Sequence, residues 1–263
     1  MGFTIVRCWG WTDFQVAAGS AYDDSEQDHT NRKGDQGKRG SRRRISPDLA
    51  NAMAANESVS EPRRLTPKGH ATRERIVATA AQLMHDHGVA GTSLGDVQKA
   101  AGVGVSQVYH YFGDKDSLIR AVIAHRIHAL LATLGGLDSM EGLRAWRDLL
   151  VDTLGQRNCE GGCPVGSLAG ELAETFPECR ADLAGGFDQW ESAIRAALQA
   201  MCDRGELRRK ANPDRLATAL LAAVEGGMLL AQVRRDPAPL ATALDEVLDR
   251  IEELRPRRAP ARP

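Results

Sequence analysis

Aromatic residues are scarce in this chain, and neither sign of charge dominates it. Of its 263 residues only 5% are aromatic, and 34 Lys and Arg stand against 35 Asp and Glu for a formal net charge of −1. Overall charge therefore does not indicate a polyanionic partner, and any basic surface that binds one must be local.

The chain also lacks a membrane-length apolar run, a secretory signal and a disulfide framework. No run of apolar residues is long enough to span a bilayer, so we expect no membrane segment. The N-terminal stretch carries Arg7 and Asp13 inside what would be the apolar part of a signal. The five cysteines are odd in number and have no framework spacing, which favours a reducing cytoplasm.

Motifs of catalysis are missing as well. We find no glycine-rich phosphate loop, no His-rich metal spacing and no nucleophile motif. Cys159 and Cys163, with three residues between them, would be only a weak zinc signal with a distant His. The sequence therefore predicts no enzyme activity, no cofactor and no metal.

Periodicity divides the chain into four parts and predicts an all-α fold. Residues 1–67 are polar and charged in blocks, which is typical of a disordered extension. Residues 68–114 predict a unit of three short helices, and residues 115–255 a larger helical domain. The Pro-rich residues 256–263 cannot continue a helix and predict a disordered tail.

The three-helix unit has the pattern of a helix-turn-helix. Order is expected from about Thr72, where TRERIVATAAQLMHDHG gives an apolar stripe that Gly88 ends. In GTSLGDVQKAAG, Thr92 or Ser93 is the expected helix cap. The third helix should bury Val108 and Phe112.

The start of the third helix is the part that such units insert into the DNA major groove. Small or hydrogen-bonding residues face outward there: Gly104, Val105, Ser106 and Gln107. Gln can bond adenine in two places, and a valine methyl suits the thymine methyl. Tyr109, His110 and Lys115 follow where the helix would leave the groove, and we expect them to contact the phosphate backbone.

The stretch TSLGDVQKAAGVGVSQVYHYFGDKDSLIRAVI resembles the DNA-binding part of the TetR family of bacterial transcriptional regulators. The match includes the Thr92–Ser93 cap, which we place with the DNA-binding residues, the Ala-Gly-Val turn and the Tyr-His-Tyr-Phe block. The family's phosphate-binding lysine maps to Lys115, whereas Val105 stands where the family often has a lysine. The resemblance implies an all-helical, cytoplasmic homodimer that represses a double-stranded DNA operator until a small molecule enters its C-terminal domain.

The larger domain contains the candidate ligand residues. CEGGCPVGSLAGELAE, residues 159–174, is similar to one TetR subgroup in which Gly-Cys-Pro opens a ligand-domain helix. Aromatic and aliphatic residues between Lys115 and Cys202 predict a bulky apolar inducer. The expected lining is Trp146, Leu150, Leu168, Phe176, Phe187 and Trp190, with Glu171 and Gln189 as polar anchors.

Dimer formation is expected from the last two helices, which should start at Asn212–Pro213 and Asp236–Pro237. An alternative function is an electrophile or oxidant sensor on the same scaffold. Cys163 precedes Pro164 at a helix start, where a helix N-terminus favours a thiolate, and Cys159 lies close by.

Overall fold

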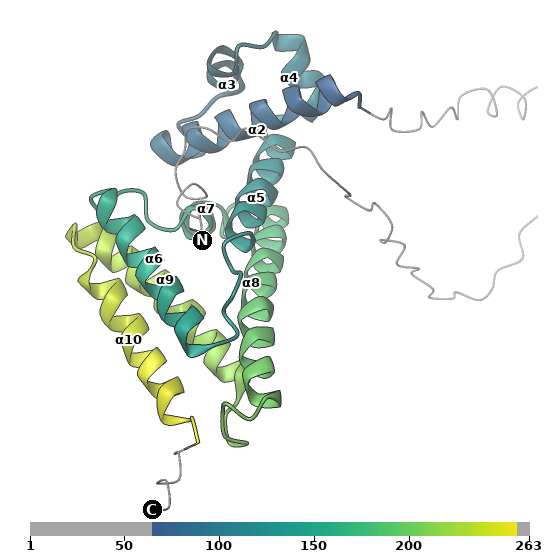
Figure 1. Ribbon diagram of the computed structural model, residues 1–263. Coiled ribbons are helices and arrows are strands. Elements are labelled where there is room, and N and C mark those ends of the chain that lie inside the picture. Colours follow the sequence, from purple (N-terminus) through teal and green to yellow (C-terminus); the bar gives the residue numbers. More distant parts are fainter. Residues whose placement is uncertain (1–64, 257–263) are drawn as a thin grey trace, which may run out of the picture. The chain divides into compact units, whose positions relative to one another are not determined.

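The computed structural model describes residues 65–256, and every regular element in this part of the chain is an α-helix. The predicted extension and tail lie outside the described residues, apart from Leu65–Pro67 and Pro256. The helices, labelled as in Figure 1, are α2 (Pro67–His87), α3 (Leu94–Ala101), α4 (Val105–Phe112), α5 (Lys115–Leu131), α6 (Met140–Gln156), α7 (Pro164–Leu172), α8 (Pro177–Asp203), α9 (Pro213–Arg234) and α10 (Ala238–Glu253). The expectation of an all-α fold is confirmed.

Helix α2 begins at Pro67, five residues before the expected start near Thr72. Proline is well suited to the first turn of a helix, because its missing N–H would have no partner there. The buried stripe begins only at Ile76 and continues through Ala80 and Met84. The first turns therefore carry no apolar periodicity from which the sequence could predict them.

The caps of α3 and α4 rest on local hydrogen bonds. Ser93 is the cap of α3: its hydroxyl accepts from Asp96 N at 3.2 Å, and the Asp96 carboxylate accepts from Ser93 N at 3.0 Å. Thr92 is buried and donates its hydroxyl to the Gly88 carbonyl at 2.9 Å. Gly102 ends α3 in the left-handed conformation, with φ 62°, and so makes the turn into α4.

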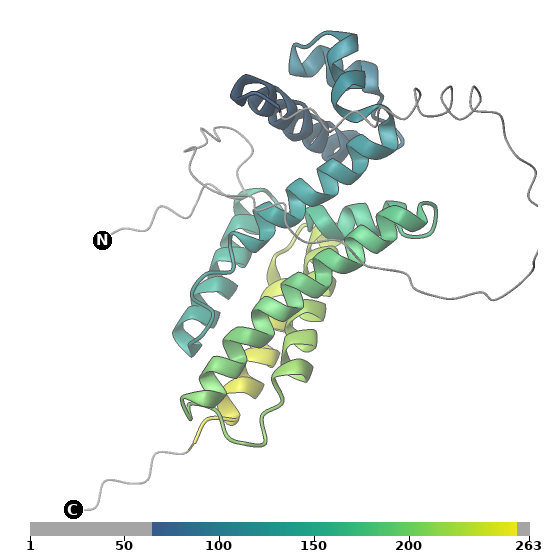
Figure 2. The ribbon, with the colours of Figure 1, turned by 90° about the vertical axis from the view of Figure 1, so that its right-hand side faces the viewer.

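The C-terminal helices pack around α8 and α9. Helix α9 contacts both α8 and α10, α10 also contacts α6, and α5 contacts α7 and α8 (Figures 1 and 2). Arg147 of α6 binds Asp245 of α10 at 2.6 Å between Nη2 and Oδ2. Asn212 caps α9 as expected, with its side chain accepting from Arg215 N at 3.0 Å.

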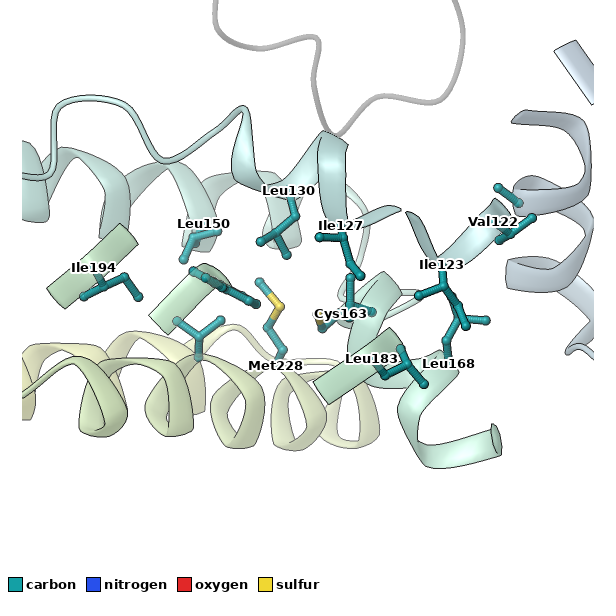
Figure 3. Packing of buried hydrophobic residues seen from close by; sticks show 14 of the residues in the cluster. Val122, Ile123, Ile127, Leu130, Leu150, Cys163, Leu168, Leu183, Ile194 and Met228 are labelled. Atoms are coloured by element: carbon teal, nitrogen blue, oxygen red, sulfur yellow. The ribbon is translucent and has the colours of Figure 1, made fainter. Parts of the chain in front are cut away.

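The expected apolar stripes form one continuous core, part of which Figure 3 shows from Val122 to Ile194. Helix α8 contributes several large, fully buried side chains to this core, among them Trp190, Ile194 and Met201. Helix α5 approaches α8 closely at Gly186, where a Cβ would clash with the Ile127 side chain. The core therefore depends on both large side chains and a close helix contact.

Helix α9 is the most apolar of the long helices in the described part of the chain. Its 22 residues include an 18-residue window with a mean hydropathy of 1.7, which is long and apolar enough to cross a membrane by length and composition. In this fold α9 packs between α8 and α10, which accounts for part of that apolar character. The remaining apolar residues lie on an exposed face, described below.

Truncating the Trp190 side chain should destabilise the fold. Trp190 is 1% exposed, so Trp190→Ala leaves a large cavity and should lower the free energy of unfolding by about 3–5 kcal/mol. Phe176→Ala is the matched control, since Phe176 is an exposed aromatic residue and should cost much less. Chemical denaturation of both variants measures the difference, and equal losses would contradict the core placement of Trp190.

Candidate nucleic-acid interface and ligand site

Helix α4 presents a row of exposed side chains on one face. Val105 is 54% exposed and Tyr109 53%, and Ser106, Gln107 and His110 are exposed beside them. The opposite face buries Val108 and Phe112, as predicted, and holds α4 on the core. Val105 and Tyr109 lie one turn apart and so form a small contiguous patch, and such patches often mark interaction sites. This face is therefore a candidate interface.

Gly104 and Gln107 form the start of α4. The Gly104 N–H donates to Gln107 Oε1 at 3.0 Å, so the Gln107 side chain closes the first turn while remaining exposed. Its amide nitrogen is still a donor. Gln107 is therefore both a helix cap and a candidate for contact with a base edge.

Two other predicted DNA-binding residues bind the segment between α2 and α3. The half-buried Lys115 donates from Nζ to the Val89 carbonyl at 2.7 Å, which leaves its ammonium two further N–H donors. Thr92 is buried against Gly88, as described above, whereas Ser93 is exposed at the start of α3. Sequence alone does not predict that Lys115 reaches back across the unit to this segment.

The predicted ligand-lining residues divide between core, surface and cavity. Trp146, Leu150 and Trp190 are buried in the packed core, and Phe187 packs partly buried against it. Phe176 and Gln189 are exposed. Leu168 and Glu171 line a cavity, and so they are the two of the eight that the structure brings together at a candidate site.

This junction cavity, of about 240 Å³, lies where α2, α5, α7 and α9 meet. Its lining is Ala81, Met84, His85, Gly88, Val122, Arg126, Gly161, Pro164, Ser167, Leu168, Glu171 and Gln232. A second, more open hollow of about 530 Å³ adjoins it and shares His85, Gly161 and Gln232. The second hollow adds Gln82, Asp86, Arg157, Asn158, Glu160 and Arg235.

Glu171 connects α7 to the segment that precedes α3. Its Oε2 accepts from Val89 N at 3.0 Å, and its Oε1 accepts from Ala90 N at 3.1 Å. Both donors belong to the segment that precedes α3. A residue predicted as a ligand anchor therefore also holds the helix-turn-helix unit on the larger domain.

Basic groups gather at the junction cavity. Arg126 donates from Nη2 to the Ala81 carbonyl at 2.6 Å, and Arg157 Nη2 lies 3.4 Å from His85 Nε2. Burial, and then the charge of Arg157, lower the pKa of Arg126 to about 9. Burial also lowers the pKa of His85, followed by the charges of Arg126 and Arg157. Sequence reasoning missed all three residues, because they come from separate segments without a shared motif.

The two thiols of the alternative prediction are buried. Cys163 caps α7, with its Sγ accepting from Gly166 N at 3.3 Å. Burial nevertheless raises the pKa of Cys163 well above its usual range, and the nearby Glu225 carboxyl raises it further. Burial and Asp236 raise the pKa of Cys159 as well. Neither thiol therefore has the lowered pKa of a reactive cysteine.

Two family models match the chain. The model "Bacterial regulatory proteins, tetR family" covers residues 76–122, and the model "Tetracyclin repressor-like, C-terminal domain" covers residues 139–247. The first match contains α3, α4 and the start of α5. The second contains the helices from α6 to most of α10.

Similar proteins and solved structures agree with these models. The chain is 30% identical to the HTH-type transcriptional repressor NemR of Escherichia coli over 68% of this chain and 92% of that protein. It is 24% identical to the HTH-type transcriptional repressor DhaR of a Mycobacterium species, over 68% of this chain and 91% of that one. A TetR transcriptional regulator from Chloroflexus aurantiacus has a solved structure with a TM-score of 0.62 and 30% identity, covering 72% of this chain and 98% of that one. With its fold, its helix-turn-helix and both family models in agreement, the chain belongs to the TetR family of bacterial transcriptional regulators.

Proposed function

We propose that this DNA-binding transcriptional regulator is a cytoplasmic, homodimeric repressor, which a small molecule releases from a double-stranded operator. The exposed row on α4, at the start of the second helix of the helix-turn-helix, carries the DNA-binding part of the proposal. Two similar proteins, NemR and DhaR, are named as repressors, which supports repression rather than activation as the mode of regulation.

In this proposal α4 enters the major groove from its N-terminal end. Val105, Ser106 and Gln107 would contact base edges, with Gly104 allowing close approach. Tyr109 and His110, farther along the exposed row, would contact phosphates. Ser93 and Lys115 are proposed phosphate contacts, and Thr92 would act by holding the segment before α3 in place.

The proposed dimer interface includes the exposed apolar face of α9. Leu229, Leu230 and Val233 are 60%, 46% and 75% exposed there, which is unusual for large apolar residues on one helix. A Cβ at Gly226 would meet no atom within 4 Å, so this position is open to a partner helix. Gly227 instead faces α10 of the same subunit, where a Cβ would crowd Leu240. Helices α9 and α10 of two copies would thus form a four-helix bundle.

The ligand would bind in the larger domain and favour a dimer geometry that does not fit the operator. A ligand with equal affinity for both geometries would leave the equilibrium between them unchanged. The junction cavity is the proposed site, since its walls come both from the C-terminal half of α2 and from α5, α7 and α9 of the larger domain. Leu168 and Glu171 remain proposed ligand contacts, whereas Trp146, Leu150, Phe187 and Trp190 would have to repack to admit a bulky apolar molecule.

The thiol sensor remains the second candidate on this scaffold. Its support is the position of Cys163 at the start of α7, where the Gly166 N–H already donates to the sulfur. The raised pKa of the Cys163 thiol works against it at neutral pH. Thiol titration of the folded protein at neutral pH distinguishes the two candidates.

Substitutions on α4 should divide into two kinds. Gln107→Ala removes a base contact and should cost about 1–3 kcal/mol at one base position, with relaxed preference there. Tyr109→Phe removes a phosphate contact and should weaken binding to all sequences alike, by about 1.5–3 kcal/mol. Affinities for operators selected from random duplexes, and for their single-base variants, measure both effects.

Thermal unfolding of both variants is the control, because Gln107 also caps α4. A uniform loss of affinity in Gln107→Ala on every DNA sequence would contradict its proposed contact with a base.

Charge on the exposed face of α9 should separate the subunits. Val233→Glu buries a carboxylate in the proposed interface and should shift sedimentation at micromolar protein from dimer to monomer, with loss of operator binding. Ala145→Glu, on the exposed face of α6, is the matched control and should remain dimeric. A Val233→Glu variant that stays dimeric and binds DNA would place the interface elsewhere.

A further inference from the structure

Two large exposed apolar side chains lie together on the exposed face of α4. Val105 is the first residue of the helix and is 54% exposed, and Tyr109, one turn later, is 53% exposed. Residues four apart lie on the same face of a helix, about 6 Å from each other along its axis. The two side chains therefore form one surface, called here the Val105–Tyr109 patch.

Packing within the chain does not account for this patch. The core side of α4 is formed by Val108 and Phe112, on the opposite face of the helix. Valine is also a poor choice for an exposed position in a helix, because its branched side chain loses rotamer freedom there. A contact with another molecule explains Val105 better than the stability of α4 does.

Gly104 leaves open space beside Val105. Its backbone has φ −72° and ψ 150°, which any residue can adopt. A Cβ at this position would meet the Ser106 hydroxyl oxygen at 3.7 Å, an ordinary contact distance. The fold therefore does not require glycine here, and the missing side chain gives another molecule room to reach Val105.

The composition of α4 suits one kind of base pair. Its sequence, VSQVYHYF, contains no lysine or arginine. These two residues make the commonest specific contact with guanine, through the O6 and N7 atoms of the base. Thymine instead presents a C5-methyl group in the major groove, which apolar side chains recognise. The side chains of α4 therefore suit a T·A pair better than a G·C pair.

The amide of Gln107 adds a hydrogen-bond donor two residues after Val105. Its Oε1 accepts from Gly104 N at 3.0 Å, which leaves the two N–H donors of Nε2 for a base. A two-point contact with adenine uses the amide oxygen and nitrogen together, whereas a donor by itself fits O4 of thymine or N7 of a purine. The arrangement of Gln107 is thus compatible with a T·A pair beside the patch.

We infer that each half-site of the operator contains a thymine whose C5-methyl group packs against the Val105 side chain and the Tyr109 ring, and that this methyl group determines the base preference at that position. The Tyr109 hydroxyl keeps its proposed contact with a phosphate. The inference rests on the proposed entry of α4 into the major groove and adds the chemical group that the helix reads there.

Replacing thymine by deoxyuridine tests the contact, because it removes the methyl group and keeps the base pairing. The probe is an operator duplex that the full chain selects from random DNA, with the thymines of a half-site replaced one at a time. At one position we expect affinity to fall about fourfold, the effect of exposing one buried methyl group, with no change at the others. Selected half-sites without a preferred thymine, or with no sensitivity to deoxyuridine, would overturn the inference.

Val105→Ala assigns the effect to its residue. This variant should bind the thymine duplex more weakly than the native chain and should no longer distinguish thymine from deoxyuridine. Ser106→Ala, at the neighbouring exposed position, is the matched control and should keep the full difference. Alanine is a better helix former than valine, so Val105→Ala should fold, which thermal unfolding checks. A difference that persists undiminished in Val105→Ala contradicts the contact.

Two substitutions of Tyr109 separate its ring from its hydroxyl. Tyr109→Phe keeps the ring and should keep the difference between thymine and deoxyuridine, although it binds all duplexes more weakly. Tyr109→Ser removes the ring and should reduce that difference. If Tyr109→Ser leaves the difference intact, the ring does not contact the methyl group.

Methylated cytosine separates the methyl group from the rest of the base pair. A C·G pair in place of the T·A pair should weaken binding, and 5-methylcytosine at the same place should recover about fourfold in affinity, since it restores the methyl group. Val105→Ala should show no recovery. Equal binding of the cytosine and 5-methylcytosine duplexes by the native chain would count against the inference.

The outcomes distinguish this inference from the proposed function. If deoxyuridine has no effect at any position while Gln107→Ala still changes the preference at one base pair, α4 reads DNA as proposed and the methyl contact is wrong. If neither change has a position-specific effect, the placement of α4 in the major groove is wrong as well.

Discussion

The carboxylate of Glu171 accepts the backbone N–H groups of Val89 and Ala90, and this pair of hydrogen bonds determines where the helix-turn-helix can sit. The segment from Gly88 to Ser93 lies between two helices, and so its N–H groups lack the partners that a helix supplies. Thr92 N donates to the Val89 carbonyl within the segment, whereas Val89 N and Ala90 N depend on Glu171. Lys115 satisfies the Val89 carbonyl from the other side. One short connection is thus held by α7 and by the first residue of α5, so a shift between these two helices would strain the hydrogen bonds that hold the segment before α3.

Helix α7 is consequently more than a spacer in the larger domain. Its start carries Cys163 next to Glu225, and its end carries Glu171. Gly166 allows this start to pack on α9, since a Cβ there would clash with the Glu225 carboxyl. The Glu225 carboxyl has a raised pKa because it is buried. The glycines in the GGCPVG stretch therefore serve close approach to polar side chains of α2 and α9, which a sequence motif alone does not reveal.

Local signals explain how much of the structure the sequence could predict. The buried positions Val108 and Phe112, the Ser93 cap and the Asn212 cap depend on neighbours within a few residues, so pattern and capping rules find them. The exposed row on α4 follows from the same periodicity. The family of the chain followed from one contiguous stretch, nearly all of which lies within the match of the N-terminal family model.

The cavity could not be predicted in the same way. His85, Arg126 and Arg157 come from α2, α5 and the residue after α6, and nothing in their spacing indicates that they meet. Trp146 and Trp190 have the composition of a ligand pocket, but large side chains at helical spacing fill a core equally well, and here they do so. Whether an aromatic side chain lines a space or fills it depends on how helices from distant segments pack together.

The exposed face of α9 also has a consequence for gene dosage. A regulator whose DNA-bound form contains two copies occupies its operator in proportion to the square of its free concentration when single copies predominate and most operators are unoccupied. Halving the concentration of the protein would then lower operator occupancy about fourfold, by mass action alone. In the proposed dimer, Leu229, Leu230 and Val233 would set the protein concentration at which this steep response ends. They would thereby determine how sharply expression of the target gene follows the abundance of the regulator.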